Sequence, residues 1–436
     1  MTQTSSVSAA PATFSSFPLL GRLSLMMFLQ YFVQGSYLPI ASVYVVYALG
    51  FSSMQVGIFG AALAVGPIFA PFIIGQFVDR MFATEYVMAF CHLIGGLLMI
   101  AIAFQSQVWL VILLGTLYSI LYVPTLMLSN SVAFGHLKNS EMEFPWIRIF
   151  GTLGFIVPAY LIEFWWLRGL EGDALHRGRA IAFVLSGVAG LAMAVYCLTL
   201  PHTPAQQRSD RQYAPGYVVS MLRSRNFLVL VIVSFFIAIA HQFVVTWYSP
   251  FLRSILDIGG WGAYEQSISS IGQICEVAVL ALLGFFLLRL GFKWTMMLGL
   301  AAYTLRCVLF SLAFGLELPF AGMLTLATVG QALHGLCFGA FLAVAYMYVD
   351  RIAPSDVRGS MQTVYGTFVI ALGFFAGGFV SGQIGEWFTS GTGDTLTRDW
   401  TGIWLSCAAL CAACFTIFGL CFPNHPPQRA DAEEQA

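Results

Sequence analysis

The segment FPWIRIFGTLGF, at residues 144–155, places three chemically different side chains on one face of a predicted helix. Arg148, Thr152 and Phe155 are four and three residues apart, and an α-helix turns by about 100° per residue, so the three point to one side. A guanidinium, a hydroxyl and an aromatic ring together suit a ligand with polar oxygens and a flat ring. Alternatively, Arg148 has no role in binding. It lies only a few residues into its helix, so its side chain can extend to the lipid headgroups on the inner side.

A second polar face lies in SSIGQICEVAV, where Gln273 and Glu276 are three residues apart. Glu276 is the acidic residue that we place deepest in an apolar helix. A carboxylate in such a place is costly unless it is paired or protonated, so it is a candidate proton carrier. The alternative is a structural role, in an ion pair with Arg148 or with a tightly bound water.

Two further helices carry polar residues among apolar ones. The segment IAHQFVVTWY holds His241, Gln242 and Thr246, and the segment ALHGLCFGAF holds His334 and Phe338 one turn apart. These side chains are candidates for ligand binding, although a lone buried histidine often has only a structural role.

The amino-acid composition indicates whether water or lipid surrounds these helices. The chain has 436 residues, of which 59% are hydrophobic and 9% are charged, whereas a soluble domain has about 25% charged residues. So few polar groups cannot cover a water-soluble fold, so we predict an integral protein of the lipid bilayer. The net charge of -1 does not favour a nucleic-acid partner.

We predict an all-α membrane protein with twelve transmembrane helices in two six-helix bundles, because a span needs about 20 mostly apolar residues. The predicted spans are 20–48, 53–78, 84–106, 108–136, 145–168, 178–200, 226–254, 264–290, 293–315, 320–350, 357–388 and 399–422. The predicted domains are an N-terminal tail 1–19, a first bundle 20–200, a linker 201–225, a second bundle 226–422 and a C-terminal tail 423–436.

The distribution of positive charge predicts the orientation. With both tails in the cytoplasm, twelve of the 19 Lys and Arg residues fall on the inner side and five on the outer side. Inner loops are normally the more positive. We therefore expect both termini in the cytoplasm.

Acid–base pairs occupy two of the inner loops. Asp79 and Arg80 end the loop GQFVDR, and Asp350 and Arg351 begin the segment DRIAPSDVRGS. We interpret these four residues as a cytoplasmic gate that latches helix ends, the alternative being ordinary solvated charge.

Catalytic and cofactor motifs are missing from the sequence. It contains no phosphate-binding GxxxxGK[ST] loop, no HExxH, no GxSxG and no CxxCH. The nine cysteines lie in apolar runs without metal-ligand spacing. We therefore expect neither an enzyme nor a bound metal or cofactor, other than a proton as coupling ion.

Several segments together resemble the nucleoside:proton symporter family of the major facilitator superfamily. They include FPWIRIFGTLGF, YVPTLMLSNS, GQICE, YVDRIAPSDVRGSMQ and GGFVSGQIGEWF, in the same order along the chain. The resemblance implies two six-helix bundles around a central cavity that opens alternately to each side.

The resemblance also implies which residues bind the nucleoside. By position these are Arg148, Thr152, Phe155, Gln242, Gln273, Glu276 and Phe338. Three positions depart from the family pattern: Val245 (with Thr246 beside it) replaces an asparagine, His334 a tyrosine and Gly339 an acid. Proton coupling is then expected to depend more heavily on Glu276, with Arg148 as its partner.

The sequence therefore predicts a proton-coupled nucleoside transporter of the bacterial inner membrane, functional as a monomer. Because of the three departures, a transporter of another small polar metabolite, such as a sugar or sugar acid, stays open as the alternative. A non-transporting membrane sensor is a weaker alternative, because neither tail is long enough for an effector domain.

Overall fold

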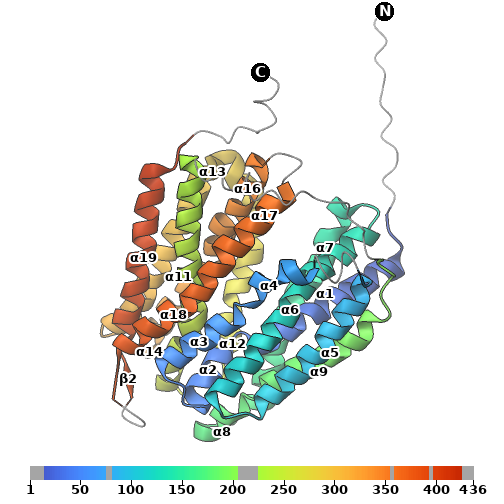
Figure 1. Cartoon of the computed structure of the whole chain (residues 1–436). Coiled ribbons are helices and arrows are strands. Elements are labelled where there is room, and N and C mark those ends of the chain that lie inside the picture. The colour runs from blue at the N-terminus through green and yellow to red at the C-terminus, as the bar shows by residue number, and fades with distance from the viewer. Residues whose placement is uncertain (1–13, 75–80, 205–223, 354–357, 392–395, 425–436) are drawn as a thin grey trace, which may run out of the picture.

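The protein is a bundle of helices in two groups that lie side by side, as the computed structural model shows (Figure 1). The structure describes residues 14–74, 81–204, 224–353, 358–391 and 396–424. Helix α1 begins and α19 ends at the same end of the molecule, the upper end in Figure 1.

The first group, coloured blue to green in Figure 1, comes from the N-terminal half. Its elements are α1 (Phe17–Tyr37), α2 (Ala41–Val43), the π-helical turn η1 (Tyr44–Ala48), α3 (Ser53–Leu63), α4 (Gly66–Ile73), α5 (Thr84–Ala103), α6 (Val108–His136), α7 (Ser140–Leu161), the π-helical turn η3 (Ile162–Leu167), α8 (Gly172–Gly178) and α9 (Ile181–Cys197). Within it, α1 packs on α7 and α9, and α5 packs on α6 and α9.

The second group, coloured yellow-green to red, comes from the C-terminal half. Its elements are α11 (Arg225–Ile258), α12 (Glu265–Ser269), α13 (Ile271–Gly315), α14 (Phe320–Ala332), α15 (His334–Leu336), η4 (Cys337–Ala343), α16 (Val344–Ile352), α17 (Arg358–Val364), η5 (Tyr365–Ala371), α18 (Leu372–Trp387), β1 (Thr389–Ser390), β2 (Thr397–Arg398) and α19 (Trp400–Cys421). Within it, α13 packs on α14, α15 and α19, and α11 packs on α18 and α19.

Local sequence explains where several helices begin. The hydroxyl of Ser52 accepts a hydrogen bond from the Gln55 backbone, and the Gln55 side chain accepts one from the Ser52 backbone, which is a capping box before α3. Asn139 caps α7 and Asp399 caps α19 by a single hydrogen bond each, in which a side-chain oxygen accepts from a backbone N–H group of the first turn.

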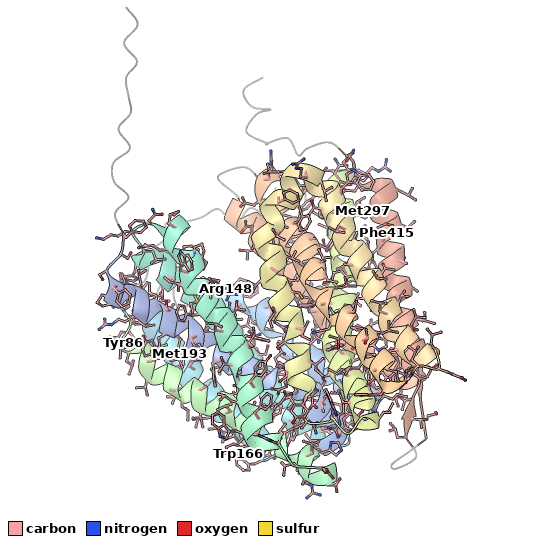
Figure 2. All side chains as sticks on the ribbon, turned by 180° about the vertical axis from the view of Figure 1, so that it is seen from behind. Tyr86, Arg148, Trp166, Met193, Met297 and Phe415 are labelled. Atoms are coloured by element: carbon pink, nitrogen blue, oxygen red, sulfur yellow. The ribbon has the colours of Figure 1, made fainter. Side chains whose placement is uncertain are left out.

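The outer surface of the bundle is apolar and fits a lipid environment. In the described part of the chain, ten helices are long and apolar enough to cross a membrane. Large side chains such as Tyr86 and Trp166 lie on this outer surface, where each is more than half exposed (Figure 2). The chain is therefore an integral, multi-pass membrane protein.

The structure confirms one detail of the predicted elements and corrects another. The break expected between the predicted spans 264–290 and 293–315 lies within α13 at Gly291, whose φ of 73° favours glycine and whose non-helical backbone separates two helices. A short antiparallel hairpin, β1–β2, also adds two strands that the all-α prediction lacked. The predicted tails and linker lie mostly outside the described residues.

The two groups meet along a seam at which α3 packs on α18. A Cβ atom on Gly57 would overlap the carbonyl oxygen of Gly378, so the two backbones are in direct contact there. Further hydrogen bonds join the groups, from Ser249 Oγ to the Pro39 carbonyl at 2.7 Å and between the hydroxyls of Ser53 and Thr389 at 3.0 Å. These contacts lie toward the lower end of Figure 1, away from the start of α1.

Candidate functional site

A cavity of about 540 Å³ lies between the two groups of helices and is lined by both. This volume falls within the range of pockets that hold small molecules. All nine residues predicted for substrate binding line it, and they come from five elements: Arg148, Thr152, Phe155, Gln242, Thr246, Gln273, Glu276, His334 and Phe338. The structure therefore brings the whole predicted set to one place.

The face of α7 turns toward the C-terminal group. Arg148, Thr152 and Phe155 line the cavity together, as their spacing predicted. The Arg148 guanidinium lies over the ring of Tyr31 from α1, 4.1 Å from its centroid. Figure 2 shows Arg148 on α7, between the two groups. A cation–π contact of this kind partly offsets the cost of a charge within a membrane protein.

The opposite wall carries Gln273 and Glu276 on α13. Among the ion pairs within 4.0 Å in the described chain, none joins Glu276 to Arg148, unlike the structural pair that we considered. Glu276 Oε2 lies instead 3.4 Å from His334 Nε2. Arg148 is still close enough to act on Glu276 through its charge. The cavity thus places a cation and a carboxyl on facing walls with room between them.

Helix α11 contributes a third wall. Gln242 extends toward Gly60 of α3, where a Cβ atom would be 2.9 Å from the Gln242 amide nitrogen. Thr246 donates a hydrogen bond to the Gln242 carbonyl at 2.9 Å. His241 Nδ1 is 2.7 Å from the Tyr303 hydroxyl, so this histidine already has a partner within its own group.

Aromatic rings occupy both sides of the cavity. Phe155 comes from α7 and Phe338 from η4, and the ring of Phe374 from α18 also lines the space. Phe374 lies 5.5 Å from His241, centroid to centroid. Sequence reasoning missed Phe374, because a phenylalanine in an apolar helix gives no signal that distinguishes lining from packing.

The three departures from the family pattern have different surroundings. Val245 lines the cavity, and so does His334. Gly339 does not, because a Cβ atom there would meet Val279 of α13 at 2.8 Å. The missing acid at Gly339 thus lies at a helix contact rather than on the cavity wall.

The predicted cytoplasmic gate is only partly within the described chain. Asp79 and Arg80 lie outside the described residues. Asp350 accepts a hydrogen bond from the Gln362 amide at 2.7 Å, which links α16 to α17. Arg351 lies over the ring of Phe292, 5.6 Å from its centroid. The role of this region as a gate stays a prediction.

A buried polar cluster that we did not predict joins the two groups at the other end. The Glu163 carboxylate accepts hydrogen bonds from the backbone of Gln266 and of Ser267. Arg179 pairs with Glu265 at 2.6 Å, and both side chains are fully buried. We call these five residues the α12 lock. No sequence spacing reveals it, because its partners are more than 80 residues apart.

Three cysteine sulfur atoms also lie together in the core of the C-terminal group. Cys307 of α13 and Cys407 and Cys411 of α19 are within 4.8 Å of one another and fully or almost fully buried. Their separation in the sequence hid this cluster from motif reading. All three are free thiols.

Comparisons with known proteins identify the family. A family model described as nucleoside H+ symporter matches residues 18–426. The xanthosine permease of Escherichia coli is 28% identical over 427 residues, covering 94% of this chain and 97% of the relative. The nucleoside permease NupG of Escherichia coli is 28% identical over 397 residues, covering 88% and 91%. A crystal structure of a mutant of the nucleoside transporter NupG matches with a TM-score of 0.83 at 24% identity, covering 93% of this chain and all of that one.

Proposed function

Because the chain belongs to the nucleoside H+ symporter family, we propose that it carries nucleosides across a membrane together with protons, by alternating access. The observation that carries this proposal is the cavity between the two groups, which all nine predicted substrate residues line. The protein acts as a carrier and not as an enzyme, with the proton as its coupling ion and no other cofactor.

The rings and amides of the cavity suit a nucleoside. Phe155 and Phe338 offer aromatic faces on opposite sides for the base, and base–aromatic stacking is worth about 1–3 kcal/mol per base. Gln242 and Gln273 each offer both a donor and an acceptor for ribose hydroxyls or a base edge.

The proton is carried by Glu276 in this proposal. The carboxyl faces the cavity beside His334 and within reach of the Arg148 charge. Proton binding removes the negative charge and so changes the attraction between the two walls. A difference in free energy between the two facing states is what coupling requires.

We propose twelve crossings for the described helices. The helical segment Glu265–Gly315 has 51 residues, which at 1.5 Å per residue is about 75 Å and too long for one crossing. It crosses twice in this proposal, with the turn at Gly291, and Phe17–Ala48 supplies one more crossing.

The proposed setting is the inner membrane of a bacterium, with both termini in the cytoplasm and one chain as the functional unit. The contacts between the groups lie at the end away from the start of α1 and the end of α19. With cytoplasmic termini, that end is the outer one, and the cavity is closed toward the outside in this state.

Two residues of the cavity wall support a second class of cargo, a small polar metabolite other than a nucleoside. Val245 and His334 both line the cavity and both depart from the family pattern. A site altered at two lining positions can accept another small polar metabolite, such as a sugar or sugar acid. The test therefore includes such a cargo.

The test is uptake into proteoliposomes with and without an inward-directed proton gradient. The cargoes are labelled uridine, adenosine and, as the sugar arm, glucose, with protein-free liposomes as background. Accumulation of nucleoside that disappears when the gradient is collapsed supports the proposal. Uptake of glucose without nucleoside, by folded protein, overturns the cargo and favours the second class.

A further inference from the structure

A series of polar contacts begins at Glu276 on the cavity wall and continues behind it as hydrogen bonds. His334 Nε2 lies 3.4 Å from Glu276 Oε2, and His334 Nδ1 lies 3.1 Å from Arg306 Nη1. A guanidinium can only donate, so Nδ1 must accept and the ring proton must reside on Nε2. His334 is therefore a neutral imidazole that donates toward the carboxylate.

The series continues through a buried glutamine. Arg306 Nη2 donates to Gln331 Oε1 at 2.5 Å, and Gln331 Nε2 donates to the Ser269 carbonyl at 2.8 Å. The arginine needs an acceptor and the carbonyl needs a donor, so both ends fix the same orientation of the amide. Arg306 is 2% exposed and Gln331 is 4% exposed. Both bonds are therefore shielded from water.

The series ends in the α12 lock. Ser269 is the last residue of α12, and its hydroxyl donates to the Glu265 carbonyl at 2.7 Å. Glu265 in turn pairs with Arg179 of the N-terminal group. These polar contacts, together with the residues of α12 that connect them, thus join the cavity carboxyl to the contacts that hold the two groups together.

We infer that Arg306 and Gln331 are positioning residues that couple protonation of Glu276 to opening of the α12 lock. This inference rests on the proposed function. With Glu276 charged, this series of contacts has an anion at its cavity end, and the neutral His334 separates that anion from the Arg306 cation. Protonation of Glu276 changes the group toward which His334 Nε2 donates, and so changes how His334 holds Arg306 against Gln331 and α12.

Other charged and titratable groups also face these residues. The Arg306 guanidinium lies 5.8 Å from the centroid of the Tyr248 ring of α11 and beside the Cys337 thiol of η4. Arg148 from α7 and Tyr31 from α1 face Glu276 across the cavity. His241 from α11 lies 5.6 Å from His334 between ring centroids, and its Nδ1 is already bonded to Tyr303. The hydrogen bonds that connect His334 to α12 run through Arg306 and Gln331.

The test uses Gln331→Met, which keeps the volume and removes both hydrogen bonds. The matched control is Gln30→Met, because Gln30 is also buried and bonded through its amide, to Thr125 and His92 of the N-terminal group. Three properties are measured for the full chain in proteoliposomes or detergent: nucleoside exchange at equal pH, accumulation driven by a proton gradient, and the pH profile of nucleoside affinity.

We expect Gln331→Met to keep exchange within about two-fold while losing about five-fold or more of the accumulation, with a flatter pH profile of affinity. A merely structural role would lower exchange and accumulation together and leave the profile unchanged. Accumulation and pH profile equal to those of Gln30→Met overturn the inference.

If Gln331→Met does not fold, Gln331→Glu replaces it, because it keeps an acceptor for Arg306 and removes the amide donor to Ser269. Loss of accumulation with exchange retained supports the inference, and wild-type coupling overturns it. Failure of the proposed function is distinguishable, since the wild-type protein would then accumulate no nucleoside.

Discussion

The Arg148 guanidinium lies 4.1 Å above the ring of Tyr31, so the cation that faces the cavity rests on an aromatic side chain of a neighbouring helix. The two residues come from α7 and α1, which pack closely within the N-terminal group. Gly151 makes this possible, because a Cβ atom there would be 2.5 Å from the guanidinium and 2.9 Å from the tyrosine ring. The ring thus fixes the position from which Arg148 can reach a ligand.

Replacement of Tyr31 by leucine is expected to weaken nucleoside binding by about two- to thirty-fold, because a cation–π contact is worth about 0.5–2 kcal/mol. Calorimetric titration of nucleoside at constant pH measures this change. Tyr31→Phe keeps the aromatic face and should bind within about two-fold of the wild type. Equal weakening by both substitutions would show that the hydroxyl, and not the ring, matters.

Removal of the Glu276 charge is expected to separate binding from coupling. Glu276→Gln keeps the shape of the side chain and one acceptor oxygen but cannot exchange a proton, so accumulation driven by a proton gradient should disappear while exchange at equal pH persists. Uptake into proteoliposomes measures both. Glu317→Gln, at an exposed acid outside the cavity, is the control. Gradient-driven accumulation by Glu276→Gln would exclude this residue as the proton carrier.

Truncation of Phe338 to alanine is expected to weaken nucleoside affinity by about five- to 150-fold, because a stacked base contributes about 1–3 kcal/mol. The comparison is with Phe104→Ala, a phenylalanine that is 74% exposed on the outer surface. Equilibrium binding of a nucleoside and of free ribose should be measured together. Loss of affinity for ribose to the same extent would argue against base stacking.

The α12 lock is expected to stabilise the closed seam strongly. Arg179→Met removes the closer of the two arginines that pair with the buried Glu265 carboxylate, leaving Arg253 at 4.0 Å, and breaking a buried ion pair from one side costs up to about 3–5 kcal/mol. The melting temperature in detergent should fall, and Arg179→Met combined with Glu265→Met should recover most of the loss. Arg177→Met, at an exposed neighbouring arginine, is the control. A double variant as unstable as the single one would refute the pairing.

Periodicity within one helix was enough to predict much of the site. The spacing of Arg148, Thr152 and Phe155 set their common face, and the step from Gln273 to Glu276 did the same on α13. Both faces line the cavity. Helical positions were also predictable, because a lipid environment demands long apolar segments.

Contacts between distant helices were not predictable in the same way. The approach of His334 to Glu276, the stacking of Arg148 on Tyr31 and the burial of Gly339 against Val279 all depend on how separate helices pack. A sequence without its relatives carries no periodic signal for such pairs.

The contact of α3 with α18 at Gly57 and Gly378 has a mechanical consequence. Two backbones that touch without intervening side chains can rotate against each other while their separation stays constant, whereas interlocked side chains resist rotation. The crossing is therefore suited to be the fulcrum about which the halves tilt. Gly57→Ala would place a methyl group against the Gly378 carbonyl oxygen and push the two helices apart, which would act on the tilting of the halves and not on the chemistry of the cargo.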